Sequence, residues 1–229
     1  MVDPQPIPTD GGVKARGFWR DALQILFFAT FARLLIGFII GVRRQNERKL
    51  PADGPMLVVA NHNSHLDTLT LLSLFPLRAL PHVRPAAAAD YFTRTPLLEW
   101  LSTTFFNILP IDRSGNREGG DPVESMARAL KSGDIVIVFP EGTRGNAGRM
   151  ERFRSGVGRV LERCVGVEVT PVALRNTGRS MAKGRAFPVP IFVDVAIGES
   201  FRPQGDARAA TTAIEHEIHA LLDDDVWSF

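Results

Sequence analysis

PMLVVANHNSHLDTLTLLSLF, residues 55–75, is the stretch that decides the fold. Its first six residues, PMLVVA (55–60), form a short apolar run after the turn residues ADG, and such a run predicts a buried strand. LDTLTLLSLF (66–75) has apolar residues at helical spacing, which predicts a helix directly after the strand. The polar residues NHNSH (61–65) lie at the junction. Because ligands of open α/β sheets bind where strands end and helices begin, this junction is a candidate functional site.

The alternation of strand and helix continues along the rest of the chain. Further strands are expected over 82–90, 106–112, 134–140, 167–174 and 190–198, and the strand over 167–174 is expected to end near Pro171. Further helices are expected over 95–105, 121–133, 156–164 and 206–224. The helix over 121–133 has the clearest boundaries, with Asp121 at its cap, Pro122 at its first position and Gly133 at its end. The pattern predicts an α/β fold with a single mixed, mostly parallel sheet flanked by helices.

The N-terminal region differs in character from the rest. Residues 1–17 are rich in Pro, Gly and charge, and we expect a flexible tail. From Ala22 to Val42 the only charged residue is Arg33, and a helix over this segment would extend about 31 Å, close to the thickness of a bilayer core. Residues 18–49 are therefore expected to form a membrane-associated helical segment, whose basic flank RRQNERK (43–49) suits anionic lipid headgroups. Residues 50–229 then form the globular domain.

How this helix would meet a membrane stays open. Each Leu, Ile, Phe or Val favours insertion by roughly 0.3 to 0.6 kcal/mol, whereas a central Arg opposes it by roughly 2.5 to 3.5 kcal/mol, so a single span through 18–42 is one possibility. A monotopic helix is the favoured one, because a stripe of small and basic residues would share one helical face and pack on the protein. That stripe consists of Thr30, Arg33, Gly37, Gly41 and Arg44. A buried core helix is the third possibility.

Composition limits the function classes. The 229 residues carry a net charge of +2, which gives no strong field for nucleic acid, and no nucleic-acid partner is expected. The single cysteine, Cys164, excludes an internal disulfide in this chain and fits a reducing compartment. It lies at the end of an expected helix, where a buried, inert thiol is expected rather than a nucleophile.

His62 and Asp67 are the candidate catalytic pair. On a continuous helix they would lie about 140° apart, so they can meet only if His62 sits in the loop and the helix starts near Ser64 or His65. Asp67 would then accept one ring N–H of His62 and fix its tautomer. The other ring nitrogen would be free to take a proton from a substrate hydroxyl.

Three other interpretations compete for the same residues. Ser64 and Asp67 could be a helix-capping pair with no catalytic role, although this leaves the histidines unexplained. A metal site could use His62, His65 and Asp67, but no further His or Cys lies nearby in the sequence, so no metal is expected. A Ser-His-Asp hydrolase is disfavoured, because the chain has no G-x-S-x-G elbow.

Four short blocks resemble those of the glycerolipid acyltransferases, whose best-known members are the 1-acyl-sn-glycerol-3-phosphate acyltransferases. NHNSHLD (61–67) resembles the N-H-x-S-x-x-D block, and ILPIDR (108–113) resembles the second block. VFPEGTRG (138–145) and VTPVAL (169–174) resemble the third and fourth. The blocks follow the family's order, and the resemblance covers roughly residues 50–200, which makes 50–229 an expected acyltransferase domain.

The resemblance implies direct transfer of a fatty acyl group from an acyl thioester to a lipid hydroxyl. The donor would be acyl-coenzyme A or an acyl carrier protein, used as co-substrate, and no cofactor is implied. His62 would be the base and Asp67 its partner. The substrate-binding residues implied by the second and third blocks are Arg113, Glu141, Gly142, Thr143 and Arg144.

The residues fit this chemistry independently of the resemblance. Arg113 and Arg144 each follow an expected strand, as His62 does, so all three could converge at one edge of the sheet. Guanidinium groups bind phosphate bidentately, although both arginines could also be ordinary surface residues. Glu141 could hold an arginine in place or bind an acceptor hydroxyl.

Two departures from the family pattern affect the acceptor side. Gly145 stands where the third block commonly has Ser, and Arg154 in RFRSG (152–156) takes the place of a frequent lysine. The expected acceptor is 1-acyl-sn-glycerol-3-phosphate, giving phosphatidic acid, at the cytoplasmic face of a membrane. Alternatives are another lysolipid acceptor such as a lyso-amino-acid lipid, a lipid thioesterase, or a lipid-binding protein without turnover.

Overall fold

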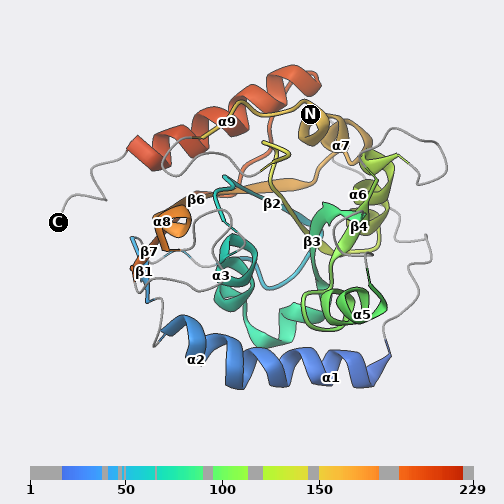
Figure 1. Ribbon diagram of the computed structural model, residues 1–229. Helices are drawn as coiled ribbons and strands as arrows, with labels where there is room; N and C mark the ends of the chain where they lie inside the picture. Colours follow the sequence, from blue (N-terminus) through green and yellow to red (C-terminus); the bar gives the residue numbers. More distant parts are fainter. Residues whose placement is uncertain are drawn as a thin grey trace.

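The computed structural model describes residues 17–37, 41–45, 48, 50–64, 66–89, 95–112, 121–143, 150–180 and 191–223. In this part of the chain a seven-stranded sheet has the order β1-β7-β6-β2-β5-β3-β4 (Figure 1). Its strands are β1 (Val42–Arg44), β2 (Met56–Ala60), β3 (Val83–Ala88), β4 (Leu109–Ile111), β5 (Ile135–Val138), β6 (Glu168–Arg175) and β7 (Val193–Ile197). The pairs are parallel except β6 with β7, which is antiparallel. The expected mixed, mostly parallel α/β sheet is confirmed.

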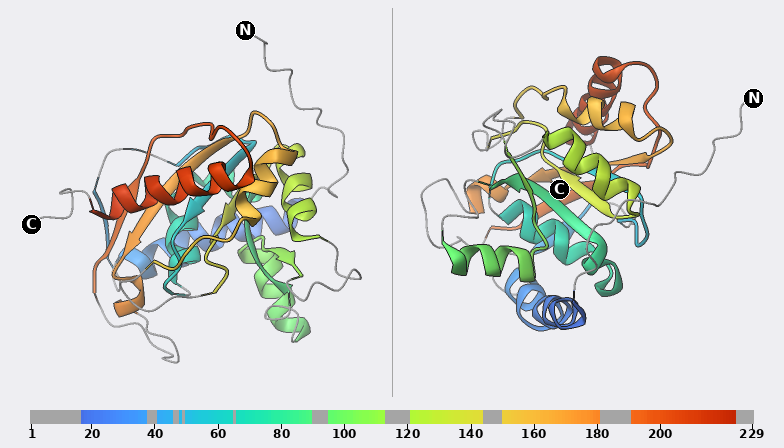
Figure 2. Two further views of the ribbon diagram at one scale, coloured as in Figure 1. Left: turned by 90° about the horizontal axis from the view of Figure 1, so that it is seen from above. Right: turned by 90° about the vertical axis from the view of Figure 1, so that its right-hand side faces the viewer.

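Helices cover both faces of the sheet, as Figure 2 shows from two sides. One face carries α1 (Phe18–Phe27), α3 (Leu66–Leu74) and α5 (Pro96–Phe105). The other carries α6 (Pro122–Lys131), α7 (Gly156–Arg163) and α9 (Ala207–Asp223). A π-helical turn (Phe28–Ala32), α2 (Arg33–Leu35), a 3-10 helix (Leu77–His82) and α8 (Thr177–Ser180) complete the described helical elements.

The period of two along the central strands explains the two cores. Val58 and Ala60 of β2 belong to the cluster under α1 and α3, whereas Leu57 and Val59 belong to the cluster under α6, α7 and α9. A strand that is buried on both faces has apolar residues at consecutive positions, which is why PMLVVA lacks polar alternation. The parallel strands β2, β3, β5 and β6 bring their carboxyl ends to one edge, where the candidate site lies.

Local capping chemistry sets helix starts as expected. Asp121 accepts a hydrogen bond from the N–H of Val123 at 2.9 Å, and Pro122 occupies the first helical position of α6. Thr95 accepts from the N–H of Leu98 at 3.2 Å and begins α5 in the same way. These two helices therefore begin within one residue of their expected positions.

The expected end of the fourth further strand near Pro171 is wrong. Pro171 lies inside β6, opposite Val59 of β2. Its carbonyl accepts from the N–H of Gly198 at 2.8 Å, just past the end of β7. The backbone nitrogen of Pro171 therefore faces β7 and not β2. The regular β6–β7 pairing includes β6 residues only from Val172 onward, so the missing N–H of Pro171 interrupts no hydrogen bond to β2.

The N-terminal segment is helical but shorter than expected. Helical structure continues from Phe18 through α2, whereas Val42 already begins β1, so a helix through residue 42 is wrong. Gly41, with φ of +67°, turns the chain from helix towards strand, a conformation that glycine adopts without strain. Among the described residues, the helices are too short or too polar for any of them to cross a bilayer. The proposed tail, residues 1–17, lies outside the described residues except for Gly17.

Two arginines of the basic flank form ion pairs within the protein. Arg43 forms a bidentate contact with the buried Asp194, at 2.8 and 3.3 Å, and Arg48 lies 2.9 Å from Glu199. Arg44 projects to the opposite side of β1 from Arg43, as expected for neighbouring residues of a strand. Arg43 and Arg48 are therefore held by carboxylates of the same chain, and the contact of the flank with lipid headgroups stays a prediction.

Candidate active site

His62 and Asp67 meet at the carboxyl end of β2. The Nδ1 atom of His62 lies 2.8 Å from Oδ2 of Asp67, and the Asp67 side chain is fully buried whereas that of His62 is 19% exposed. His62 lies in the loop and α3 begins at Leu66, which is the arrangement that the spacing of five residues required. The ring nitrogen Nε2, on the far side of the imidazole, has no hydrogen-bond partner within the described residues. It is therefore available to a substrate proton.

Asp67 also holds the loop in place. Its Oδ2 atom accepts from the backbone N–H of Asn63 at 2.7 Å and of Ser64 at 2.8 Å. The Ser64 hydroxyl in turn accepts from the N–H of Leu66 at 3.3 Å, at the start of α3. The same carboxylate oxygen of Asp67 thus makes the backbone contacts expected of a helix cap and the ring contact expected of a catalytic pair. Capping alone does not account for the contact with His62.

Glu141 joins the loop that carries His62 to the loop that carries Glu151. Its Oε1 atom accepts from the backbone N–H of His62 at 2.6 Å, and its Oε2 atom accepts from the N–H of Glu151 at 2.9 Å. Burial raises the pKa of Glu141 from its ordinary 4.5 to about 7, although the two backbone donors pull the pKa back down. The structure thus adds a positioning role to those considered from sequence, since both oxygens bind main-chain N–H groups.

The imidazole is fixed on its face as well as its edge. The ring of Phe139, at the end of β5, stacks on that of His62 with centroids 4.3 Å apart and an interplanar angle of 22°. Asn61 precedes His62 and binds both main-chain groups of Leu174 in β6, donating to its carbonyl at 2.9 Å and accepting from its N–H at 2.7 Å. The strand ends that flank His62 are therefore locked together.

The third block forms a tight turn after β5. Gly142 has φ of +79°, and its N–H donates to the carbonyl of Phe139 at 3.1 Å. A Cβ atom at this position would lie 2.7 Å from Nε of Arg154, so glycine is what lets that guanidinium lie against the turn. Thr143 is exposed beside it. Arg113 and Arg144 lie outside the described residues, as does His65, so their predicted roles stay predictions.

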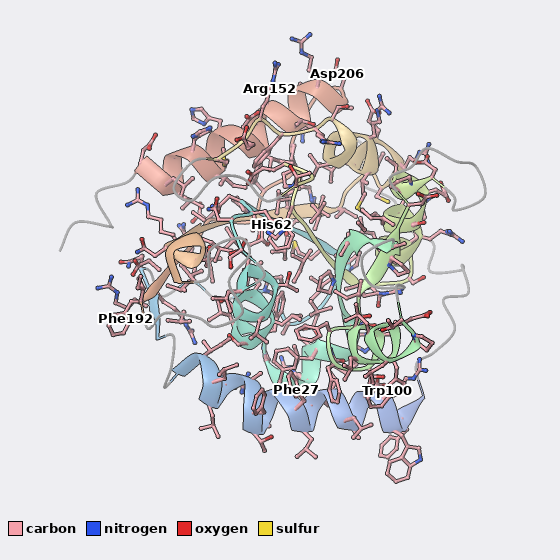
Figure 3. All side chains as sticks on the ribbon, in the orientation of Figure 1. Phe27, His62, Trp100, Arg152, Phe192 and Asp206 are labelled. Carbon is pink, nitrogen blue, oxygen red and sulfur yellow. The ribbon has the colours of Figure 1, made fainter. Side chains whose placement is uncertain are left out.

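Sequence reasoning assigned no role to Asn61 or Phe139, although both stand inside the quoted blocks. Asn61 immediately precedes the histidine, and Phe139 immediately follows β5, so position at a strand end was the available signal. Ring stacking and a cross-strand amide contact depend on strand order, and strand order cannot be obtained from local patterns. Figure 3 shows His62 near the centre of the fold, between β2 and α3.

Comparison with known proteins identifies the family of this chain. The acyltransferase family model matches residues 41–175, which is more than half of the chain and contains His62, Asp67 and Glu141. The chain belongs to the acyltransferase family.

Several relatives within this acyltransferase family carry names that specify an acceptor. The chain is 32% identical over 138 residues to the chloroplastic 1-acyl-sn-glycerol-3-phosphate acyltransferase LPAT1 of Arabidopsis thaliana, covering 58% of this chain and 35% of that protein. It is 31% identical over 126 residues to the human 1-acyl-sn-glycerol-3-phosphate acyltransferase alpha, covering 54% of this chain and 42% of that protein. The chain thus spans less than half the length of either relative.

The fold of this chain also matches a solved structure. The crystal structure of the 1-acyl-sn-glycerophosphate acyltransferase PlsC from Thermotoga maritima superposes with a TM-score of 0.67 at 22% identity. The match covers 90% of this chain and 81% of that one. At this level of identity the likeness concerns the arrangement of helices and strands.

Proposed function

We propose that this protein is a membrane-associated O-acyltransferase that moves a fatty acyl group from an acyl thioester to the free hydroxyl of a lysophospholipid. The acceptor is proposed to be 1-acyl-sn-glycerol-3-phosphate, so that the product is phosphatidic acid, and the donor to be acyl-coenzyme A or an acyl carrier protein. The observation that supports this best is the contact between His62 and the buried Asp67, 2.8 Å long, at the carboxyl edge of the sheet. The names of the relatives supply the acceptor class.

The proposed chemistry assigns a proton to each step. With Nδ1–H donated to Asp67, the Nε2 atom of His62 takes the proton of the acceptor hydroxyl as that oxygen attacks the thioester carbonyl carbon. The tetrahedral intermediate then expels the thiolate, the C–S bond breaks, and the imidazolium returns its proton to the sulfur. The carboxylate of Asp67 stabilises the imidazolium between these steps. The products are an ester and a free thiol.

The proposed acceptor requires cations near the hydroxyl. Arg154 lies against the Gly142 turn, one residue from Glu141, whose carboxylate binds the His62 backbone. Arg113 and Arg144 are proposed to bind the acceptor phosphate with Gly142 and Thr143 nearby, because guanidinium groups match phosphate geometry. Glu141 is proposed to position the loop that carries His62.

Membrane association is proposed to use the outer side of the N-terminal helix. Phe28, Ala32 and Ile36, spaced four residues apart, are buried against the sheet side. Other large apolar side chains of the same helical segment are exposed to solvent: Phe18, Trp19, Leu23, Leu26, Phe31 and Leu34. A helix packed on the body of a protein with its apolar side outward suits an interfacial position, with the helix axis in the membrane plane.

Helix α5 extends this apolar surface. Phe27 of α1 packs on Phe105 of α5 with ring centroids 4.8 Å apart, and Phe105 contacts Trp100 at 5.7 Å. Leu97 and Trp100 of α5 are exposed, and Figure 3 places Trp100 beside α1. Tryptophan favours membrane interfaces. Together with the buried free thiol of Cys164, this supports a location at the cytoplasmic face of a membrane.

Product analysis tests the reaction. The protein is incubated with isotope-labelled acyl-coenzyme A and a panel of lysolipids, and the products are identified by mass spectrometry. Labelled phosphatidic acid, formed in preference to acylated neutral or amino-acid lipids, is the expected result. If labelled free fatty acid is the main product, the protein is a thioesterase and not a transferase. If no product forms, the result favours a lipid-binding protein without turnover.

Flotation with phosphatidylcholine vesicles tests the membrane surface. The double substitution Leu26→Glu with Phe31→Glu should abolish flotation, because it charges the apolar side of the helix. Val165 is exposed on the loop between α7 and β6, so Val165→Glu is the matched control and should leave flotation unchanged. Equal flotation of all three proteins would contradict the interfacial assignment.

A further inference from the structure

A cavity of about 700 Å³ lies between α2, the end of α3 and β1. Two basic residues, Arg33 and Arg44, line it together with the apolar residues Ile36, Val42 and Phe192. Cations combined with apolar walls suit an amphiphile that carries a negative charge.

The cavity is separate from the candidate active site. His62, Asp67 and Glu141 do not line it. Its α3 contribution begins at Ser73, near the opposite end of the helix from Asp67, and the six-residue step between them corresponds to a rise of about 9 Å. Figure 3 likewise shows Phe192 at the β1 and β7 edge, well apart from His62.

The two arginines of the cavity differ from their neighbours in charge balance. Arg43 is held by Asp194 and Arg48 by Glu199, whereas no carboxylate of the described residues pairs with Arg33 or Arg44. Arg33 donates from Nη2 to the carbonyl of Phe75 at 2.8 Å, just past the end of α3, and this neutral acceptor anchors the side chain without cancelling its charge. Unpaired cations in a cavity are an anion-binding arrangement.

We propose that this cavity binds the phosphate headgroup of an anionic membrane phospholipid. Arg33 follows Phe31 and precedes Leu34, which are both exposed on the outer side of the same helix, so the cavity adjoins the proposed membrane surface. Phe192, 56% exposed, extends the apolar lining. A headgroup seated here leaves its acyl chains beside apolar side chains, whereas a free phosphate ion gains nothing from them. The site goes beyond the proposed transfer reaction and requires no turnover.

Gly37 offers a steric test of the site. It lines the cavity, and a Cβ atom built on it meets nothing within 4 Å, so a larger side chain can occupy the cavity without disturbing the fold. Gly37→Leu also removes a residue with poor helix propensity. Gly37→Leu therefore adds bulk at the cavity wall and leaves both arginines unchanged, while Arg44→Gln removes a charge and adds no bulk.

The experiment measures binding without an acyl donor. Full-length protein is titrated by calorimetry with dihexanoylphosphatidylglycerol, dihexanoylphosphatidylcholine and inorganic phosphate. Both lipids are kept below their critical micelle concentrations. The phosphatidylglycerol should bind most tightly, and both Gly37→Leu and Arg44→Gln should weaken it about five-fold or more. Arg48→Gln is the control, because it also removes one positive charge but from an exposed ion pair outside the cavity. It should change the affinity less than two-fold.

Four outcomes overturn the proposal. Equal affinity for the two phospholipids removes the requirement for an anion, and equal affinity for phosphate and phosphatidylglycerol makes this a free-phosphate site. Unchanged binding by Gly37→Leu places the lipid elsewhere. Loss of binding in His62→Ala would place the headgroup in the active site, whereas retained binding together with lost acyl transfer separates this site from the proposed reaction.

Discussion

Oδ2 of Asp67 accepts three hydrogen bonds, and one of them comes from the Nδ1 atom of His62 at 2.8 Å. The other two come from main-chain N–H groups of the loop that carries His62, so the same oxygen shapes the loop and orients the ring. An acid that serves both purposes couples the geometry of the base to the start of α3. The predictions below follow from this coupling and from the groups around it.

The first prediction concerns the coupling between His62 and Asp67. Asp67→Asn keeps an oxygen acceptor but removes the charge that stabilises an imidazolium, so kcat should fall by about 10² to 10⁴. If Asp67 acts through His62, the double variant with His62→Ala should be no slower than His62→Ala alone. Steady-state rates of the four proteins complete this cycle. Multiplicative losses would mean that the two residues act separately.

Phe139 should matter through ring orientation. Phe139→Leu keeps an apolar side chain but removes the stacked face from His62, and kcat should fall roughly two- to ten-fold, as expected for the loss of one aromatic pair. Phe106 is another half-buried phenylalanine packed against the same core, so Phe106→Leu controls for packing. If both substitutions reduce kcat equally, the stacking contact contributes nothing specific.

Glu141 should make the free energy of unfolding depend on pH. Its pKa is raised in the fold to about 7 from 4.5, so between these values the folded protein holds a proton that the unfolded chain has released. Stability therefore decreases as the pH rises from 4.5 towards 7 and then levels off, by up to about 3 kcal/mol from this group. Glu141→Gln cannot ionise and should lack this decrease.

Urea unfolding across this pH range measures the effect. The difference in unfolding free energy between wild type and Glu141→Gln should change as the pH rises from 4.5 through 7, and it should level off above the folded pKa. Glu151 has an exposed side chain and lies close in sequence, so Glu151→Gln is the matched control and should retain the decrease seen in the wild type. A pH-independent difference for Glu141→Gln would contradict the assignment.

A side chain at Gly142 should destabilise the protein and displace Arg154. Gly142→Ala forces an L residue into φ of +79° at a cost of about 1 to 2 kcal/mol and also displaces the Arg154 guanidinium. Gly133 has φ of +87° with open space around it, so Gly133→Ala has the backbone cost alone. Thermal unfolding should show similar losses for both, whereas only Gly142→Ala should raise KM for a phosphorylated acceptor. Equal KM values would leave Arg154 outside acceptor binding.

Local patterns predicted most of the sheet. The strand and helix on either side of residues 61–65 were placed almost to the residue, because a buried apolar run and a helical leucine pattern have different periods. The strand β1 was missed because VRR lies at the end of an apolar helix and pairs with β7, which is about 150 residues away in sequence. Such pairings depend on topology, which local periodicity does not contain.

The site, like the sheet, was predictable where it depends on local spacing and not where it depends on strand order. The spacing of His62 and Asp67 required a loop followed by a helix start, and the structure has both. The contact of Glu141 with the His62 backbone joins the ends of β5 and β2, which are adjacent only because of the strand order. The expected stripe of Thr30, Arg33, Gly37, Gly41 and Arg44 is not one helical face, yet the last four of these residues line one cavity because the chain turns at Gly41.

The most direct test of the proposed reaction is the rate at which His62→Ala transfers a labelled acyl group from acyl-coenzyme A to 1-acyl-sn-glycerol-3-phosphate. With saturating substrates and an unchanged circular dichroism spectrum, kcat should fall by at least about 10²-fold relative to wild type, since a positioned base contributes about 10² to 10⁴. A His62→Ala protein that forms phosphatidic acid at the wild-type rate would contradict the central role of this imidazole.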